Sequence, residues 1–274
     1  MKDPSASKRF DTPRSPCFDL SFLILCSSLG GPYVLLIVAL LASMIAYTTP
    51  AEILAALSTR EIRFSVFLSV VSSTLSAIAS VWVAVPLGYV MSRYDFWGKK
   101  LVDALLDIPI VLPPLVVGLS LLILFQTPPL RWFQQFIPVT YAIPSVIIAQ
   151  FAVAAAFAVR TMRVTFDQIP TRREEVALTL GCSRGGAFWR VVLPESWRGL
   201  LTAFTLAWTR SLGEFGPVLV FSGATRMRTE VLPTTVFLEL SVGNLYGAVA
   251  VSLLMIVVAA VVLIVVRNWG LERP

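Results

Sequence analysis

Histidine is absent from this 274-residue chain, and charged residues are scarce, at 14% of the sequence. The missing histidine removes the side chain that most often acts as a general base or a metal ligand. The only cysteines, Cys17, Cys26 and Cys182, contain no CxxC spacing, so we predict neither a disulfide framework nor a metal site. A GxxxxGK[ST] phosphate loop is also missing, because Gly98–Lys100 lacks the upstream glycine and the following Ser or Thr. These absences disfavour an enzyme.

Apolar residues are abundant instead, at 57% against about 45–50% in soluble domains. A membrane-spanning helix needs about 20 apolar residues, and the long, continuous runs differ from the alternating pattern of membrane barrels. The first run is too long for a signal peptide and more runs follow it, so we expect it to be retained. The six candidate spans cover residues 20–47, 64–92, 101–126, 141–160, 198–222 and 243–267.

The Lys and Arg residues give this predicted bundle an orientation. With the N-terminus inside, sixteen of the 22 basic residues fall in cytoplasmic segments and five in outside segments, while Arg210 lies within the fifth span. We therefore predict an all-α polytopic membrane protein with about six transmembrane helices and both termini cytoplasmic. Residues 1–19 form a cytoplasmic tail and residues 20–274 the transmembrane domain. The net charge of +6 then reflects topology, not nucleic-acid binding.

The longest predicted cytoplasmic segment, residues 161–197 between spans four and five, carries clear local signals. Thr171–Glu174 has the pattern of a capping box and predicts a helix over Arg172–Leu180. Gly181 suits the left-handed C-terminal cap of that helix. Ser183 is expected to cap a second short helix. The segment is thus predicted to be a helix, a glycine turn and a second helix.

The second helix is expected to end at Leu193–Pro194, because the residue before a proline avoids the helical conformation. The segment is unusually apolar for a solvated loop. Some of its apolar side chains are expected to pack on the membrane domain and others to face a partner. These residues are Val176, Leu178, Leu180, Phe188, Trp189, Val191 and Val192.

The sequence Glu175–Ala177, three residues, Gly181, nine residues, Val191–Pro194 resembles the EAA loop of bacterial ATP-binding cassette importers. Val176 and Val191 replace an Ala and an Ile of the family pattern. In that family the loop is a coupling helix that sits in a groove of the ATPase subunit. The alternative is an amphipathic helical hairpin that only caps the bundle. The resemblance implies coupling residues Glu174, Glu175, Val176, Ala177, Leu180, Gly181, Leu193 and Pro194.

Three further stretches, Arg93–Lys100, Leu105–Gly118 and Arg210–Gly216, resemble the permeases for molybdate, tungstate and sulfate. The resemblance spans about residues 62–267. It implies a multi-pass protein of the bacterial inner membrane, a non-enzymatic transport subunit that carries molybdate or tungstate, with sulfate next. It also implies a permease homodimer, an extracytoplasmic solute-binding protein, and cytoplasmic ATP-binding subunits that hold ATP and Mg. No cofactor is expected on this chain.

The same stretches contain the candidate pathway. Prolines inside the third span remove backbone donors, which suits either a solute path or a packing kink. Arg210 lies about 18 Å along a helix from Arg198, near mid-membrane, and is spaced i,i+4 from Glu214. That pair is interpreted as a gate or as a structural lock; an ion-coupled secondary carrier that uses it is the alternative function. The candidate residues are Pro113, Pro114, Arg210, Ser211, Glu214 and Gly216.

Overall fold

A computed structural model describes residues 16–271 of the protein. Throughout this range the ordered elements are helical, with no strand among the described residues, which confirms the all-α prediction. The chain divides into two units, one ending at Tyr47 and the other beginning at Thr48. Each unit is described by itself.

The first unit contains one helix, α1 (Pro16–Tyr47), with Pro32 inside it. The predicted first span is therefore one continuous helix despite its Gly-Gly-Pro interruption. Its 32 residues exceed the roughly 20 that a bilayer core requires. The predicted tail of residues 1–19 lies outside the described residues, apart from the first turn of α1.

The second unit begins with the short helix α2 (Pro50–Ser58). A capping box starts it: the Thr49 hydroxyl accepts from the Glu52 amide at 3.4 Å, and Glu52 accepts from the Thr49 amide at 2.8 Å. Helix α3 (Arg60–Arg93) follows directly. The polar pair at residues 49 and 52 thus satisfies backbone donors at the start of α2.

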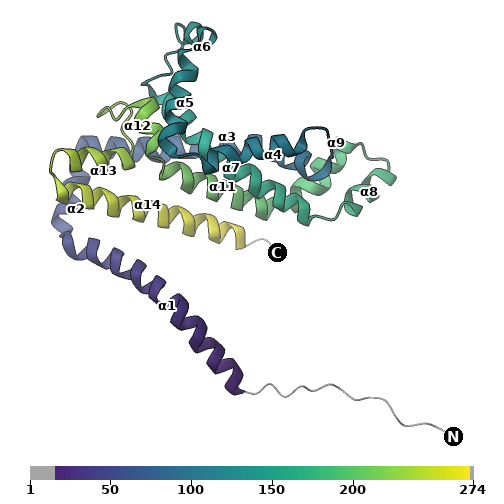
Figure 1. Cartoon of the computed structure of the whole chain (residues 1–274), viewed down its shortest axis with the longest axis horizontal. Helices are drawn as coiled ribbons and strands as arrows, with labels where there is room; N and C mark the ends of the chain where they lie inside the picture. The colour runs from purple at the N-terminus through teal and green to yellow at the C-terminus, as the bar shows by residue number, and fades with distance from the viewer. Residues whose placement is uncertain (1–15, 272–274) are drawn as a thin grey trace. The chain divides into compact units, whose positions relative to one another are not determined.

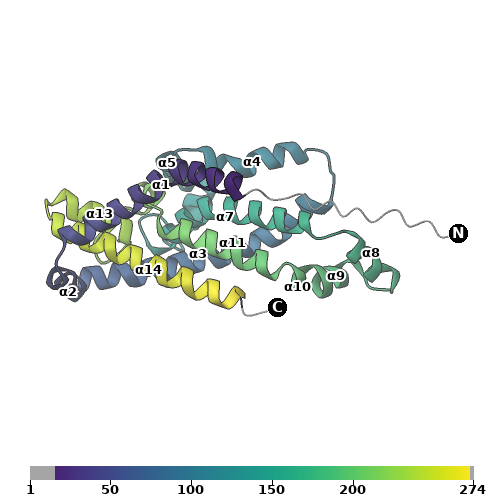
Figure 2. The same cartoon turned by 90° about the horizontal axis from the view of Figure 1, so that it is seen from below.

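Three long helices form the core of this unit: α3, α7 (Ile143–Gln168) and α11 (Trp197–Leu212), which lie side by side in Figures 1 and 2. Small side chains let α3 approach α7 closely, as membrane helices commonly require. Serine hydroxyls on the buried face of α3 add polar contacts, for example from Ser76 to the carbonyl of Ile147 at 2.9 Å. The buried serines of α3 are Ser65, Ser69, Ser72, Ser73, Ser76 and Ser80.

The predicted third span is sharply bent. Helices α4 (Lys99–Val111) and α5 (Pro114–Gln126) meet at 112°, and the break falls at the prolines. Beyond α5 lies a short helix, α6 (Pro128–Phe133). Pro109 is accommodated inside α4.

The predicted fifth span is also broken, into α11 and α12 (Gly216–Ser222), and is followed by α13 (Leu232–Ser241) and α14 (Leu245–Leu271). Among the described residues, four helices are long and apolar enough to cross a membrane, or five if the bent pair counts as one span. The predicted number of six is therefore not confirmed, because the fifth predicted span consists of two shorter helices. Helix α7 also continues to Gln168, so the first part of the predicted loop is helical.

Candidate functional site

The first helix of the loop between α7 and α11, α8 (Arg172–Thr179), ends in the glycine turn that the sequence predicted. Gly181 has φ +88°, in the left-handed region. The Gly181 amide donates to Leu178 and the Cys182 amide donates to Ala177, both at 3.0 Å. These two bonds form a Schellman motif, which satisfies the last carbonyls of the helix and turns the chain.

The capping box predicted at the start of α8 is wrong. Thr171 has helical dihedral angles, φ −56° and ψ −29°, and its side chain makes no capping bond. Glu174 is turned toward α3 instead, where its Oε1 lies 2.6 Å from Arg93 Nε and its Oε2 accepts from the Tyr89 hydroxyl at 2.8 Å. A carboxylate binds a guanidinium, which carries a full positive charge, more strongly than it binds an uncharged backbone amide, so Glu174 pairs with Arg93 and does not cap α8.

Helix α8 presents a mixed apolar and acidic surface. Leu180 is 81% exposed and Val176 51%, and Glu175 is exposed beside them. Ala177 is buried and holds the other face of α8 against the rest of the loop. Exposed apolar side chains rimmed by charge are typical of a protein-docking surface. We call Glu175, Val176 and Leu180 the docking face.

The second loop helix runs further than predicted. Ser183 caps α9 (Arg184–Ala187) through the Gly186 amide at 3.1 Å, as expected, and a π-helical turn (Phe188–Val192) continues into α10 (Leu193–Glu195). The expected end at Leu193–Pro194 is wrong, because Pro194 occupies the first turn of α10, where a missing amide donor is tolerated.

The glycine cap gives a direct test of the loop geometry. Alanine at Gly181 would have to adopt φ near +88°, which costs about 1–2 kcal/mol. Alanine at Gly185, inside α9, meets nothing within 4 Å and avoids that strain. We expect Gly181→Ala to lower the thermal unfolding temperature of the purified protein and Gly185→Ala to leave it unchanged or raise it. Equal unfolding temperatures would contradict the left-handed cap.

The two broken spans meet each other. Gly216, at the start of α12, lies so close to α5 that a Cβ there would be 2.9 Å from Pro114 Cβ. A Cβ on Gly118 would be 2.7 Å from Pro217 Cα. The structure thus brings Pro114 and Gly216, two of the predicted pathway residues, into direct contact through backbones that only glycine allows so close. Pro113 lies at the bend itself, as the N-cap of α5.

Arg210 and Glu214 pair as predicted, but they do not share one helix. Helix α11 ends at Leu212, and Glu214 lies in the break before α12. Arg210 Nη2 is 3.2 Å from Glu214 Oε2, and the Arg210 guanidinium lies 5.7 Å from the ring centre of Phe157. Glu214 is 1% exposed and Arg210 36% exposed. The pair therefore links the last turn of α11 to the break, with Glu214 buried and Arg210 partly exposed.

Ser211, beside the break, is fully buried, and its hydroxyl has no hydrogen-bond partner among the described residues. The docking face and the break lie apart: Figure 1 shows α8 and α9 beyond one end of α7 and α11, and α5 and α12 toward the other. The predicted coupling residues of the loop therefore lie apart from the predicted pathway residues, which lie at the breaks in the third and fifth predicted spans.

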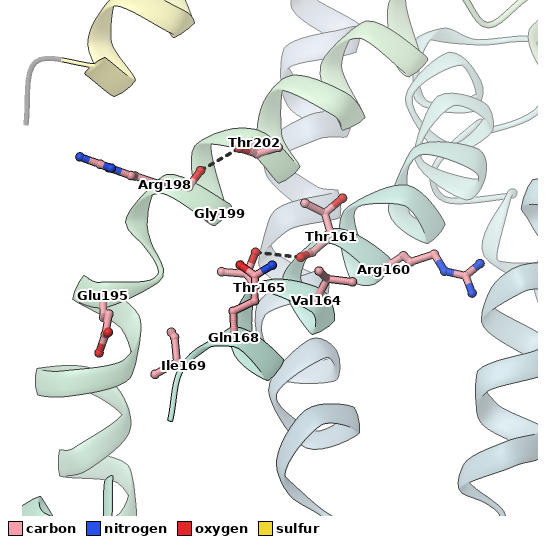
Figure 3. Close-up of a pocket in the computed structure, with 10 residues that line it drawn as sticks. All are labelled: Arg160, Thr161, Val164, Thr165, Gln168, Ile169, Glu195, Arg198, Gly199 and Thr202. Carbon is pink, nitrogen blue, oxygen red and sulfur yellow. Dashed lines mark hydrogen bonds between the residues drawn. The ribbon is translucent and has the colours of Figure 1, made fainter. Parts of the chain in front are cut away.

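The sequence interpretation missed two features. One is the Arg93 partner of Glu174 described above. The other is a groove of about 570 Å³ between the C-terminal end of α7 and the N-terminal end of α11 (Figure 3). Polar residues at helical spacing on both helices were the available signal. The groove is lined by Arg160, Thr161, Val164, Thr165, Gln168, Ile169, Glu195, Arg198, Gly199 and Thr202.

A bundle of long apolar helices with broken spans and an exposed helical loop is the architecture of a polytopic membrane protein. Residues 84–270 match the family described as binding-protein-dependent transport system inner membrane component. The chain belongs to this family and is a multi-pass inner-membrane permease of an ATP-binding cassette importer. The membership favours an importer over the ion-coupled carrier. Its relatives are transport subunits and not enzymes.

Three relatives show how close the match is. The chain is 35% identical to a probable molybdenum ABC transporter permease of Haloferax volcanii over 74% of this chain and 73% of that one. It is 33% identical to the molybdenum permease ModB of Mycobacterium tuberculosis, over 80% and 83%. It is 36% identical to the sulfate permease CysT of Escherichia coli, over 61% of each chain.

Solved structures share the fold at low sequence identity. A chain of a bacterial ABC transporter that imports the acidic polysaccharide alginate superposes with a TM-score of 0.72 at 16% identity, over 93% of this chain and 96% of that one. A chain of the MetNI methionine ABC transporter gives 0.62 at 18% identity, over 75% and 93%. These similarities establish the permease fold alone.

Proposed function

We propose that this permease carries a tetrahedral oxyanion inward, with molybdate or tungstate preferred and sulfate next. The relatives at 31–36% identity carry names of molybdenum, molybdate/tungstate and sulfate systems. Arg210, the arginine beside the break, is already paired with Glu214. Selectivity therefore resides largely in an extracytoplasmic binding protein that delivers the anion.

The observation that carries the proposal is the docking face on α8. Leu180 is 81% exposed on a helix that the Gly181 turn projects from the bundle. An apolar residue in that position is stabilised when a partner covers it. The partner is a cytoplasmic ATP-binding subunit, which holds the ATP and Mg, and Glu175 is the charged anchor in its groove.

Transport then proceeds by alternating access in a permease homodimer. Closure of the ATPase dimer displaces α8, and the displacement moves the helices that meet at Pro114 and Gly216. Arg210 and Glu214 act as a gate in this scheme: their separation would expose a cation to a passing dianion, and their pairing restores a neutral barrier. A gate of this kind favours passage over tight binding, as conduction requires.

Reconstitution of the permease with its ATPase and binding protein in proteoliposomes tests this function. We expect ATP-dependent uptake of labelled molybdate, competed by tungstate more strongly than by sulfate. Titration of the binding protein with the three anions should give the same order. Uptake without the ATPase subunit, or a binding protein that prefers an amino acid or a sugar, would refute the proposal.

A further inference from the structure

Glu174 and Glu175 are neighbours in α8 but lie in different surroundings. Glu175 is exposed on the docking face, whereas the side chain of Glu174 is 13% exposed and that of its partner Arg93 is 9% exposed. Both Glu174 oxygens are used, one by Arg93 Nε at 2.6 Å and the other by the Tyr89 hydroxyl at 2.8 Å. Glu174 is therefore committed to the permease and unavailable to a docked partner.

Arg93 joins three helices at this point. It belongs to the last turn of α3, it pairs with Glu174 in the first turn of α8, and its Nη2 donates to the Ile169 carbonyl at the end of α7 at 2.8 Å. Next to it, the Ser92 hydroxyl donates to Asp167 at 2.5 Å. A planar guanidinium that makes several directed bonds holds its partners in one geometry better than a flexible ammonium does.

The other ionic contact of α8 is weaker. Arg173 pairs with Glu195 of α10, and these side chains are 55% and 28% exposed. Exposed ion pairs contribute little and are screened by salt, whereas removal of one partner from a buried pair leaves an uncompensated charge. Of these two ion pairs, Glu174–Arg93 is therefore the firmer connection between α8 and the bundle.

Arg93 belongs to α3, a helix that extends through the whole core of this unit. Helix α3 is 34 residues long and packs along both α7 and α11, and α11 leads into the break that contains Glu214. A buried indole bond, from Trp208 Nε1 to Thr74 Oγ1 at 3.1 Å, fixes α11 to α3. Movement of the Arg93 end of α3 is therefore transmitted to the helix that carries the gate.

We propose that the Arg93–Glu174 pair is the joint that converts displacement of α8 into movement of α3. Glu174 is a positioning residue in this role: it acts through Arg93 and does not contact the ATPase. Glu175 docks the ATPase, and Glu174 transmits the movement. The inference rests on the proposed ATP-driven import, and it divides two adjacent acidic residues into separate tasks.

Coupling is measured as anion uptake per ATP hydrolysed in the reconstituted full complex. We expect Glu174→Gln and Arg93→Gln to keep ATPase association and hydrolysis but to lower this ratio about threefold to thirtyfold. The double variant should be no worse than either single one, because the two residues act as a unit. Asp95→Asn, which removes an exposed ion pair with Lys99 on the same side, is the control and should leave the ratio unchanged.

Tyr89→Phe is a milder variant that removes one bond to Glu174 and leaves the ion pair in place. It tests the role of the joint if the charge variants do not fold. An intermediate loss of coupling supports the joint. An unchanged ratio in Glu174→Gln, or in Tyr89→Phe where the charge variants do not fold, overturns it. Loss of ATPase binding in Glu174→Gln also overturns it, because that result would place Glu174 on the docking face. Failure of the unaltered complex to import with ATP would instead refute the proposed function.

Discussion

Replacing Leu180 by aspartate is expected to abolish ATP-driven uptake while the permease stays folded. Leu180 is 81% exposed, so the substitution buries no charge within the chain. At the docked interface the aspartate would forfeit roughly 1.5–3 kcal/mol of apolar burial and add the cost of desolvating a carboxylate. Association with the ATPase should weaken by about tenfold to a hundredfold or more.

Affinity of the purified permease for its ATPase subunit is the direct measurement, with the thermal unfolding temperature recorded alongside. Leu180→Ala should have an intermediate effect, because it removes apolar area without adding charge. Lys100→Asp, a charge change at another exposed cytoplasmic position, should leave the affinity close to that of the parent. Unchanged affinity in Leu180→Asp would show that the ATPase docks elsewhere.

Local signals in the sequence predicted the glycine turn and the second cap of the loop between α7 and α11, but not where the loop helices begin and end. The Gly181 cap and the Ser183 cap depend on bonds within five residues, and both were predicted correctly. The role of Glu174 was not, because its partner Arg93 lies 81 positions away in the sequence. A local pattern cannot compete with a buried charged partner that only the tertiary fold supplies.

In the membrane region, too, local features were predictable from the sequence and contacts between distant segments were not. Apolar run length and proline positions correctly predicted a first continuous span and a disturbed third one, because both are properties of the local chain. The break at residues 213–215, between α11 and α12, interrupts a stretch that the apolar run length predicted to be one span. Contact between the two broken spans was not predictable, since it depends on how α5 and α12 pack and not on either sequence alone.

That contact underlies the second large effect: Gly118→Ala is expected to destabilise the permease and impair transport. The added Cβ would lie 2.7 Å from Pro217 Cα, 3.0 Å from the Pro217 carbonyl oxygen and 3.1 Å from Val220 Cβ. Two of these are backbone atoms of α12, which cannot move aside as a flexible side chain can. Overpacking of this kind costs about 1–3 kcal/mol.

The change should appear as a lower unfolding temperature in detergent and as reduced uptake at normal ATPase association. Gly185→Ala introduces the same methyl group where nothing lies within 4 Å, so it controls for the substitution itself. Gly216→Ala, which presses on Pro114 from the other helix, should resemble Gly118→Ala. Combining the two should cost less than their sum, because one separation of α5 from α12 relieves both clashes. Full additivity, or a Gly118→Ala protein as stable as Gly185→Ala, would show that the two broken spans do not pack through these glycines.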